Sequence, residues 1–223
     1  MQTEFWHEAW AKAPEPGWQQ KAYNRFLTRH WAATGAVPQE TVFVPLCGRS
    51  LDMQWLREYG HHIVGIDLSV SALERFCEQQ SIDAVCERDG ELSVFRAPGW
   101  TLYAGDFFKL QSSHLSQVSR VFDRAALIAM PEDMREKYSA HLTAVLPGGV
   151  EMFLITISYD QEKMKGPPFS VPDAEVHRLY RNFSASALES DSGPDALGNL
   201  RERGLDSLTE TCFLLQPQVD TET

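Results

Sequence analysis

The first 38 residues carry apolar side chains at helical intervals, whereas later apolar residues come in short uninterrupted runs. The helical spacing predicts a short helix over 4–13 and a second over about 18–34. Runs without alternation are typical of strands that are covered on both faces. The sequence therefore predicts a helical N-terminal cover, 1–38, followed by an α/β core over 41–215.

Five apolar runs are predicted to be strands of one parallel sheet, because helical patterns separate them and right-handed crossovers follow from that order. The runs are 41–46, 63–68, 101–104, 118–122 and 150–157, and the helices are placed over about 50–58, 70–80 (after Ser69 as N-cap) and 132–145. Residues 84–96 are ambiguous and could form a small hairpin. Two further runs, 182–188 and 208–215, predict an antiparallel hairpin with no convincing helix between them. The prediction is a Rossmann-like, mostly parallel seven-stranded sheet.

Composition limits the protein's possible partners. The chain has 223 residues, 43% of them hydrophobic, which suits a single domain over 1–223. Its net charge of −11 does not favour binding to nucleic acid or to an anionic membrane surface. No run of 18 apolar residues is present, and the first residues do not resemble a signal peptide. A cytoplasmic protein with reduced cysteines and no metal is expected, since the four cysteines form no CxxC pair.

The ends of the first two predicted strands carry the strongest chemical signal. In an open α/β sheet the ligand lies at the carboxyl ends of the strands. The first strand is followed by Leu46-Cys47-Gly48, and Asp67, 19 residues after Gly48, ends the second. A carboxylate about 20 residues after the first turn accepts hydrogen bonds from ribose hydroxyls. The alternatives are a turn that only needs glycine and a charge that stabilises the next helix.

The third and fourth strand ends are less specific. Asp106 could accept from an adenine amino group with Phe107 beside the ring, although Gly-Asp is also ordinary turn chemistry. Asp123-Arg124 ends the fourth strand, and taken alone it is better interpreted as part of a surface ion pair than as a site. Cys47, beside the first turn, is better interpreted as a small buried side chain than as a nucleophile.

Other nucleotide sites do not fit these residues. A nicotinamide site needs G-x-G-x-x-G, whereas the first turn has one glycine in Pro45-Leu46-Cys47-Gly48. A phosphate-binding G-x-x-x-x-G-K-[ST] loop does not occur in the chain. A cofactor without phosphate, such as S-adenosylmethionine, is compatible with a single glycine.

Several blocks together resemble the thiopurine S-methyltransferase family. They are Phe43-Val44-Pro45-Leu46-Cys47-Gly48, Val64-Gly65-Ile66-Asp67, Phe122-Asp123-Arg124-Ala125-Ala126-Leu127, and Ser158-Tyr159-Asp160 with Gly166-Pro167-Pro168-Phe169. The resemblance extends from about Trp6 to Leu215. It implies a Rossmann-like methyltransferase fold and S-adenosylmethionine as the cofactor. It also implies cofactor contacts at Trp10, Leu46, Asp67 and Arg124.

The resemblance further implies direct methyl transfer to an aromatic or heterocyclic thiol such as a thiopurine, by a monomer. Arg124 is the candidate for positioning the substrate, and no residue is assigned as a catalytic base. Arg201 is named as a further substrate candidate, although the stretch around it matches the family poorly. Reduced selenium or tellurium species remain alternative substrates, and a non-catalytic regulator that binds S-adenosylmethionine remains an alternative function.

Two segments are predicted to close over the site. One is the Trp6–Trp18 segment, whose helices are interrupted by prolines and a glycine. The other is the loop Lys163–Pro172, which is too rich in proline and glycine for regular structure and carries the apolar Phe169. Phe169 is expected to pack on the substrate or on the tryptophan segment, the alternative being a place in the core.

Overall fold

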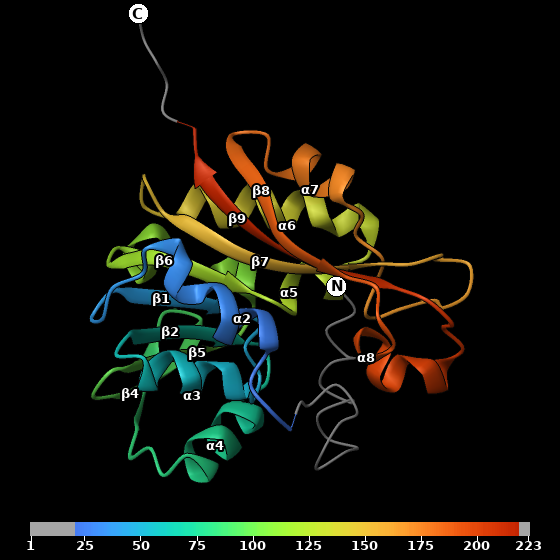
Figure 1. The fold of residues 1–223 in the computed structure, drawn as a ribbon. Helices are drawn as coiled ribbons and strands as arrows, with labels where there is room; N and C mark the ends of the chain where they lie inside the picture. Colours follow the sequence, from blue (N-terminus) through green and yellow to red (C-terminus); the bar gives the residue numbers. More distant parts are fainter. Residues whose placement is uncertain (1–20, 219–223) are drawn as a thin grey trace, which may run out of the picture. The chain divides into compact units, whose positions relative to one another are not determined.

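The computed structural model describes residues 21–218, except for the side chains of residues 194 and 195. The contacts within the chain divide it into two compact units, one ending at Ser119 and the other beginning at Arg120. Each unit contains strands with helices packed on them (Figure 1). The predicted helix over 4–13 and the tryptophan segment lie outside the described residues.

The first unit is built on five strands in the order β3-β4-β5-β2-β1. Strands β1 (Thr41–Pro45), β2 (His62–Asp67) and β5 (Trp100–Ala104) pair in parallel. Their residues are largely buried, as their non-alternating apolar runs predict. The ambiguous region 84–96 forms an antiparallel hairpin of β3 (Val85–Asp89) and β4 (Leu92–Ala97), and β4 also pairs with β5.

The helices of the first unit begin at polar caps. They are α2 (Arg25–His30), α3 (Leu51–Glu58) and α4 (Val70–Gln79), with 3₁₀ helices η1 (Trp31–Thr34), η2 (Phe107–Lys109) and η3 (Ser112–Leu115). Side chains of Asn24, Ser50 and Ser69 accept the first free amides of α2, α3 and α4. Helices α3 and α4 pack against β2, and α4 also packs against β5 (Figure 1). The caps and packing fix where each strand ends.

The predicted helix over 18–34 is wrong in its extent. Residues 21–24 are not helical, and α2 begins only at Arg25, because Asn24 is extended and its side chain accepts from Phe26 and Leu27. The end is as predicted, since Gly35 has a φ of 77°. The apolar residues continue at helical spacing on both sides of Asn24, so the spacing alone did not show that Asn24 caps the helix.

The second unit contains a parallel pair and an antiparallel hairpin. Strand β6 (Val118–Asp123) spans the boundary at Ser119 and pairs in parallel with β7 (Glu151–Ser158). Strand β9 (Thr209–Pro217) is antiparallel to β7 and to β8 (Phe183–Asp191), with a register shift between Ala187 and Glu189. The antiparallel C-terminal hairpin is thus confirmed.

The second unit also contains helices that the pattern did not reveal. They are α5 (Ala126–Ala129), α7 (Asp173–Leu179), α8 (Pro194–Leu197) and the 3₁₀ helix η4 (Gly198–Arg203), in addition to the predicted α6 (Glu132–Val145). The expectation of no helix between the last two strands is therefore wrong. Segments of four to seven residues are too short to display a helical period, so only α6 was recognisable.

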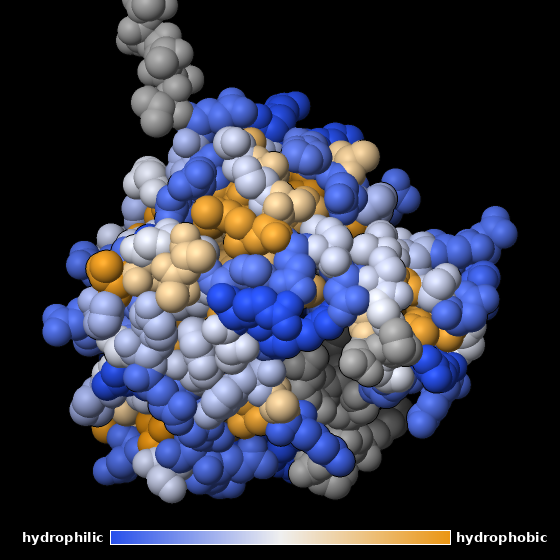
Figure 2. Space-filling view, viewed as in Figure 1, coloured by the Kyte–Doolittle hydropathy of each residue, from blue (hydrophilic) through white to orange (hydrophobic). Residues whose placement is uncertain are grey.

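The predicted number of seven strands is wrong, since the described residues form nine. The two additional strands are β3 and β4. Four of the five β3 residues are exposed, so the strand has no apolar run to reveal it. The predicted parallel core and antiparallel C-terminal strands are confirmed, and β3 and β4 add a second antiparallel part to the sheet. The face drawn in Figure 2 is mainly hydrophilic, with apolar residues in small groups.

No helix among residues 21–218 is long and apolar enough to cross a membrane.

Candidate functional site: two strand-end carboxylates

The turn after β1 has an uncommon backbone conformation. Leu46 has a φ of 46° and Gly48 a φ of 49°. Glycine adopts such values freely, but a leucine there is rare and strained. The Cys47 amide donates to the Ile66 carbonyl over 2.9 Å, which keeps the turn attached to β2. This bond to β2 therefore helps to hold Leu46 in its strained conformation.

Cys47 is a packing residue of this turn. Its side chain is buried, and a Cβ atom at Gly65 would lie only 2.9 Å from its Sγ. Burial raises the pKa of the Cys47 thiol well above its ordinary value, and the nearby Asp67 charge adds to the shift. A thiol held in its neutral form is a poor nucleophile. The interpretation of Cys47 as a small buried side chain fits these contacts.

Asp67, at the end of β2, joins the first two turns. Its Oδ2 accepts from the Gly48 amide and its Oδ1 from the Ser69 amide, each over 2.9 Å. Its carbonyl accepts from the Gly105 amide over 2.9 Å. Burial raises the pKa of the Asp67 carboxyl to about 6, although the two amides oppose that shift. The structure thus brings Gly48, Asp67 and the Gly105 turn together at one edge of the first unit.

The acceptor positions of the Asp67 carboxylate suit a ribose. An ionised carboxylate has about four acceptor positions, and the two described amides occupy two of them. The remaining positions can accept the two hydroxyls of a ribose, which are donors of the right kind. The same carboxylate offers nothing to a phosphate. The residues therefore fit the nucleoside part of S-adenosylmethionine.

The turn after β5 gives a divided result. Asp106 is exposed, and its Oδ1 accepts from the Phe108 amide over 3.0 Å, so it caps η2. Phe107 is only 2% exposed, and its ring meets that of Phe108 edge-on with centroids 5.4 Å apart. Gly105, with a φ of 147°, leaves no room for a side chain, since a Cβ would lie 2.6 Å from Leu92 Cδ2. The bond to the Phe108 amide accounts for an aspartate at position 106 in this turn. Contacts of Asp106 and Phe107 with an adenine stay a prediction.

A second buried carboxylate ends β6. Asp123 Oδ1 accepts from the amides of Ala126 and Leu127, and its Oδ2 accepts from the Tyr138 hydroxyl over 2.7 Å. Burial raises the pKa of the Asp123 carboxyl to about 6, against the effect of these three donors. Asp123 thereby fixes the start of α5 and the half-buried Arg124 between them.

Sequence reasoning missed this role of Asp123. No regular cap signal marks this role, because the N-cap of α5 is Ala125 and Asp123 lies two residues before it. The partner Tyr138 is 15 residues away on α6, and only the fold brings it close.

The predicted lid residues fall in different regions. Trp6, Trp10 and Trp18 lie outside the described residues. Phe169 is partly buried, and its amide donates to the Ile128 carbonyl of α5 over 2.7 Å. Arg201 lies exposed on η4, where its carbonyl accepts from the Gly204 amide over 3.1 Å. Among residues 21–218, no group of three His, Cys, Asp or Glu is arranged to hold a metal ion.

Two solved structures that share this fold are methyltransferases. The 1,6-didemethyltoxoflavin-N1-methyltransferase of Burkholderia thailandensis matches with a TM-score of 0.64 and 16% identity, over 97% of this chain and 87% of that chain. A SAM-dependent methyltransferase of Anabaena variabilis matches with a TM-score of 0.68 and 15% identity, over 97% and 95%. At these identities the match defines the fold, which is the Rossmann-like fold of S-adenosylmethionine-dependent methyltransferases.

Sequence comparison gives the family. Residues 1–218 match the thiopurine S-methyltransferase (TPMT) family. A thiopurine S-methyltransferase of Azotobacter vinelandii is 39% identical over 97% of this chain and 99% of its own length. One of Pseudomonas fluorescens is 44% identical over 80% and 82%. The chain belongs to the thiopurine S-methyltransferase family, whose methyl donor is S-adenosylmethionine.

Proposed function

We propose that this protein transfers the methyl group of S-adenosylmethionine to the sulfur of an aromatic or heterocyclic thiol such as a thiopurine. Membership of the family supports the reaction type. The observation that carries the proposal is Asp67, a buried carboxylate at the end of β2 that is oriented by the Gly48 and Ser69 amides and keeps acceptor positions for a ribose. The protein is expected to act in the cytoplasm, as one methyltransferase domain and as a monomer.

The residues proposed to hold the cofactor divide by chemistry. Asp67 accepts from the ribose hydroxyls, and the Leu46–Gly48 turn lets backbone approach the ligand closely. Asp106 accepts from the adenine amino group, with Phe107 beside the ring. Trp10 donates its indole N–H to the methionine carboxylate. Arg124 adds a cationic contact at the start of α5.

When bound, S-adenosylmethionine supplies a methyl group on a positively charged sulfur, already activated for attack. The protein's task is then to align the two reactants, which can lower a barrier by roughly 7–11 kcal/mol. Arg124 holds the thiol in its ionised form, because a nearby positive charge favours the thiolate. An aromatic thiol is acidic enough to need no dedicated base. Trp6, Trp18, Phe169 and Arg201 are proposed to contact the substrate and to exclude water.

Transfer of labelled methyl groups to 6-mercaptopurine tests the proposal. The protein, S-adenosylmethionine labelled in its methyl group and 6-mercaptopurine should give a labelled thioether, at a rate that is proportional to enzyme and saturates with thiol. An Arg124→Ala variant should lose most of the rate and should bind S-adenosylhomocysteine more weakly but still measurably, because Arg124 is one of several proposed cofactor contacts. Tight binding of S-adenosylhomocysteine without transfer to any aromatic thiol would overturn the proposal in favour of a non-catalytic regulator.

A further inference from the structure

The loop after β7 is an ordered structure rather than a loose connector. We call residues 159–171 the proline loop. The Tyr159 hydroxyl donates to the Pro168 carbonyl over 2.6 Å, and the Tyr159 amide donates to Ser170 Oγ over 2.9 Å. The Ser170 amide donates to Gln161 Oε1 over 2.9 Å. These bonds cross the loop from side to side, so its backbone is fixed from within.

The proline loop holds the ring of Phe169 in one place. The Phe169 amide donates to Ile128 of α5, and the Val171 amide donates to Ile157 of β7, each over 2.7 Å. A Cβ atom built on Gly166 would lie 2.5 Å from Phe169 Cδ1, so the ring covers the bare face of this glycine. Gly166 also has a φ of 75°, which a residue with a side chain rarely adopts. Position 166 therefore determines where the ring can lie.

A second segment, 197–208, contacts the proline loop through two polar side-chain interactions. Arg203 Nη1 donates to the Pro167 carbonyl over 2.7 Å, next to Gly166 in the chain. Lys163 Nζ lies 2.7 Å from Asp206 Oδ2 in an exposed ion pair. Both pairs join the same two segments. The charge-assisted bond from a planar guanidinium to a carbonyl is the more directional of the two.

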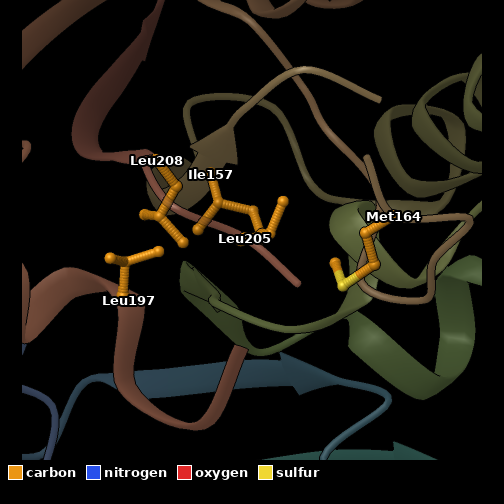
Figure 3. Close-up of a cluster of buried hydrophobic side chains, with 5 residues drawn as sticks. All are labelled: Ile157, Met164, Leu197, Leu205 and Leu208. Atoms are coloured by element: carbon orange, nitrogen blue, oxygen red, sulfur yellow. The ribbon is translucent and has the colours of Figure 1, made fainter. Parts of the chain in front are cut away.

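An apolar cluster lies beneath these polar contacts. It consists of Ile157, Met164, Leu197, Leu205 and Leu208, each at most 7% exposed. Figure 3 shows these side chains: Leu197, Leu205 and Leu208 belong to the segment 197–208, and Met164 belongs to the proline loop. Met164 is the proline loop's own contribution, since Ile157 belongs to β7. The apolar cluster keeps the two segments together, and the polar contacts set their register.

We propose that Arg203 and Gly166 are positioning residues that hold the Phe169 ring as a fixed wall for flat aromatic substrates. This inference rests on the proposed function, since Phe169 is proposed there to contact the thiol substrate. It differs from a mobile lid in that the proline loop is already fastened. Substrate selection then depends on Arg203 without any contact between Arg203 and the substrate.

Arg203 is distinguished from its neighbour Arg201 by geometry. Both residues lie exposed on η4, but only Arg203 has a described contact with the proline loop, through its bond to the Pro167 carbonyl. The Lys163–Asp206 pair is also exposed, with 40% and 68% of the side chains accessible. Surface pairs of this kind are weak and screened by salt. Arg203 is therefore the residue whose removal should free the proline loop.

Binding of a methylated product provides the test, because it does not require turnover. The affinity for 6-methylthiopurine is measured by calorimetry with S-adenosylhomocysteine bound. Arg203→Ala and Gly166→Ala are compared with wild type, each alone and combined with Phe169→Ala. Arg181→Ala, the loss of an exposed arginine elsewhere in the second unit, is the matched control. Amide exchange at Phe169 and Ser170 reports on the proline loop directly, since local opening sets the exchange rate.

Arg203→Ala and Gly166→Ala should each weaken 6-methylthiopurine binding about three- to tenfold, as expected for a displaced aromatic contact. S-adenosylhomocysteine affinity should not change, and Arg181→Ala should behave as wild type. In the Phe169→Ala background both losses should disappear, which is the sign of a coupled pair. Arg203→Ala should also speed exchange in the proline loop, and Arg203→Lys should partly restore both properties.

The inference would be overturned if Arg203→Ala and Gly166→Ala still weakened 6-methylthiopurine binding in the Phe169→Ala background. It would also be overturned if Arg203→Ala sped amide exchange in the proline loop but left the affinity for 6-methylthiopurine unchanged. If Arg203→Ala does not fold, Gly166→Ala, alone and combined with Phe169→Ala, decides the inference, with the exposed Lys165→Ala as its control. Wild-type protein that binds 6-methylthiopurine and methylates no thiol would overturn the proposed function alone, and the binding data would still decide on Arg203. A wild type that binds no flat aromatic ligand overturns the inference.

Discussion

The two units each place a buried aspartate at the end of a parallel strand, yet the two carboxylates have different surroundings. Asp67 accepts two backbone amides, from the turns on either side of it. Asp123 accepts two backbone amides of α5 and also the Tyr138 hydroxyl over 2.7 Å. Burial raises the pKa of both carboxyls to about 6. Burial therefore disfavours the ionised form of both carboxyls to a similar degree, but their hydrogen-bond partners differ.

The difference indicates which carboxylate serves a ligand. The additional donor at Asp123 is a protein hydroxyl, whereas Asp67 keeps those acceptor positions, and ribose hydroxyls would be equivalent partners there. Asp123 then acts on the fold and on the start of α5, and Asp67 is the carboxylate that we propose to bind the cofactor. Position at a strand end is common to both and does not distinguish them.

The largest expected effect is the loss of stability in Asp123→Ala. The substitution leaves the Tyr138 hydroxyl and the Ala126 and Leu127 amides without their acceptor in a buried place. Each buried group left without a partner costs about 1–3 kcal/mol. A decrease of about 3 kcal/mol in unfolding free energy is expected from urea denaturation.

The exposed Asp83→Ala serves as the control for that measurement, and its unfolding free energy should stay within about 0.5 kcal/mol of wild type. Asp123→Ala with wild-type stability would mean that the Tyr138 bond and the α5 cap are not what holds this carboxylate in place.

A smaller effect, and on binding rather than on folding, is expected for Asp67→Asn. The amide keeps the shape of the side chain but exchanges one acceptor oxygen for a donor, so the ribose hydroxyls lose a partner. Affinity for S-adenosylhomocysteine should fall by about 1–3 kcal/mol in calorimetry. The control is Tyr138→Phe, which removes a donor to Asp123 and should cost about 1 kcal/mol of stability while leaving this affinity unchanged. Equal losses of affinity in both variants would erase the proposed division of roles.

The parallel strands and long helices could be predicted from the sequence because their signals are local. Buried runs such as 41–45 and the complete helix α6, Glu132–Val145, need no information from distant residues. Helix α7 and the β3–β4 hairpin could not be predicted in this way. Helix α7 is short and is tied by Glu175 to the buried Arg135 of α6 over 2.6 Å. Such partners, 40 residues apart, become visible only in the fold.

The candidate site shows the same limit. Gly48 and Asp67 were predicted together because their spacing reflects one strand–helix–strand unit. The Arg203–Pro167 contact joins residues 36 apart across loops that have no regular spacing. Arg201 and Arg203 are equally plausible from sequence, since both are arginines on the same short segment. Only the direction of the side chain toward Pro167 separates them.

The smallest effect concerns pH, and it should have opposite signs for binding and for folding at Asp67. Its folded pKa of about 6 lies above the ordinary value of about 3.9, so the folded state holds the proton more tightly. Its contribution to unfolding free energy is therefore present below about pH 4 and lost as the pH rises through 6. Ribose binding needs the ionised acceptor, so affinity for S-adenosylhomocysteine should instead rise, about tenfold from pH 5 to pH 7. Calorimetry at pH 5, 6 and 7 measures that rise, and Asp67→Asn should abolish it. Tyr138→Phe should keep the rise, because Asp123 contributes to folding and not to ribose binding. A pH-independent affinity in wild type, or a rise that survives in Asp67→Asn, would show that Asp67 is not the group that binds the ribose.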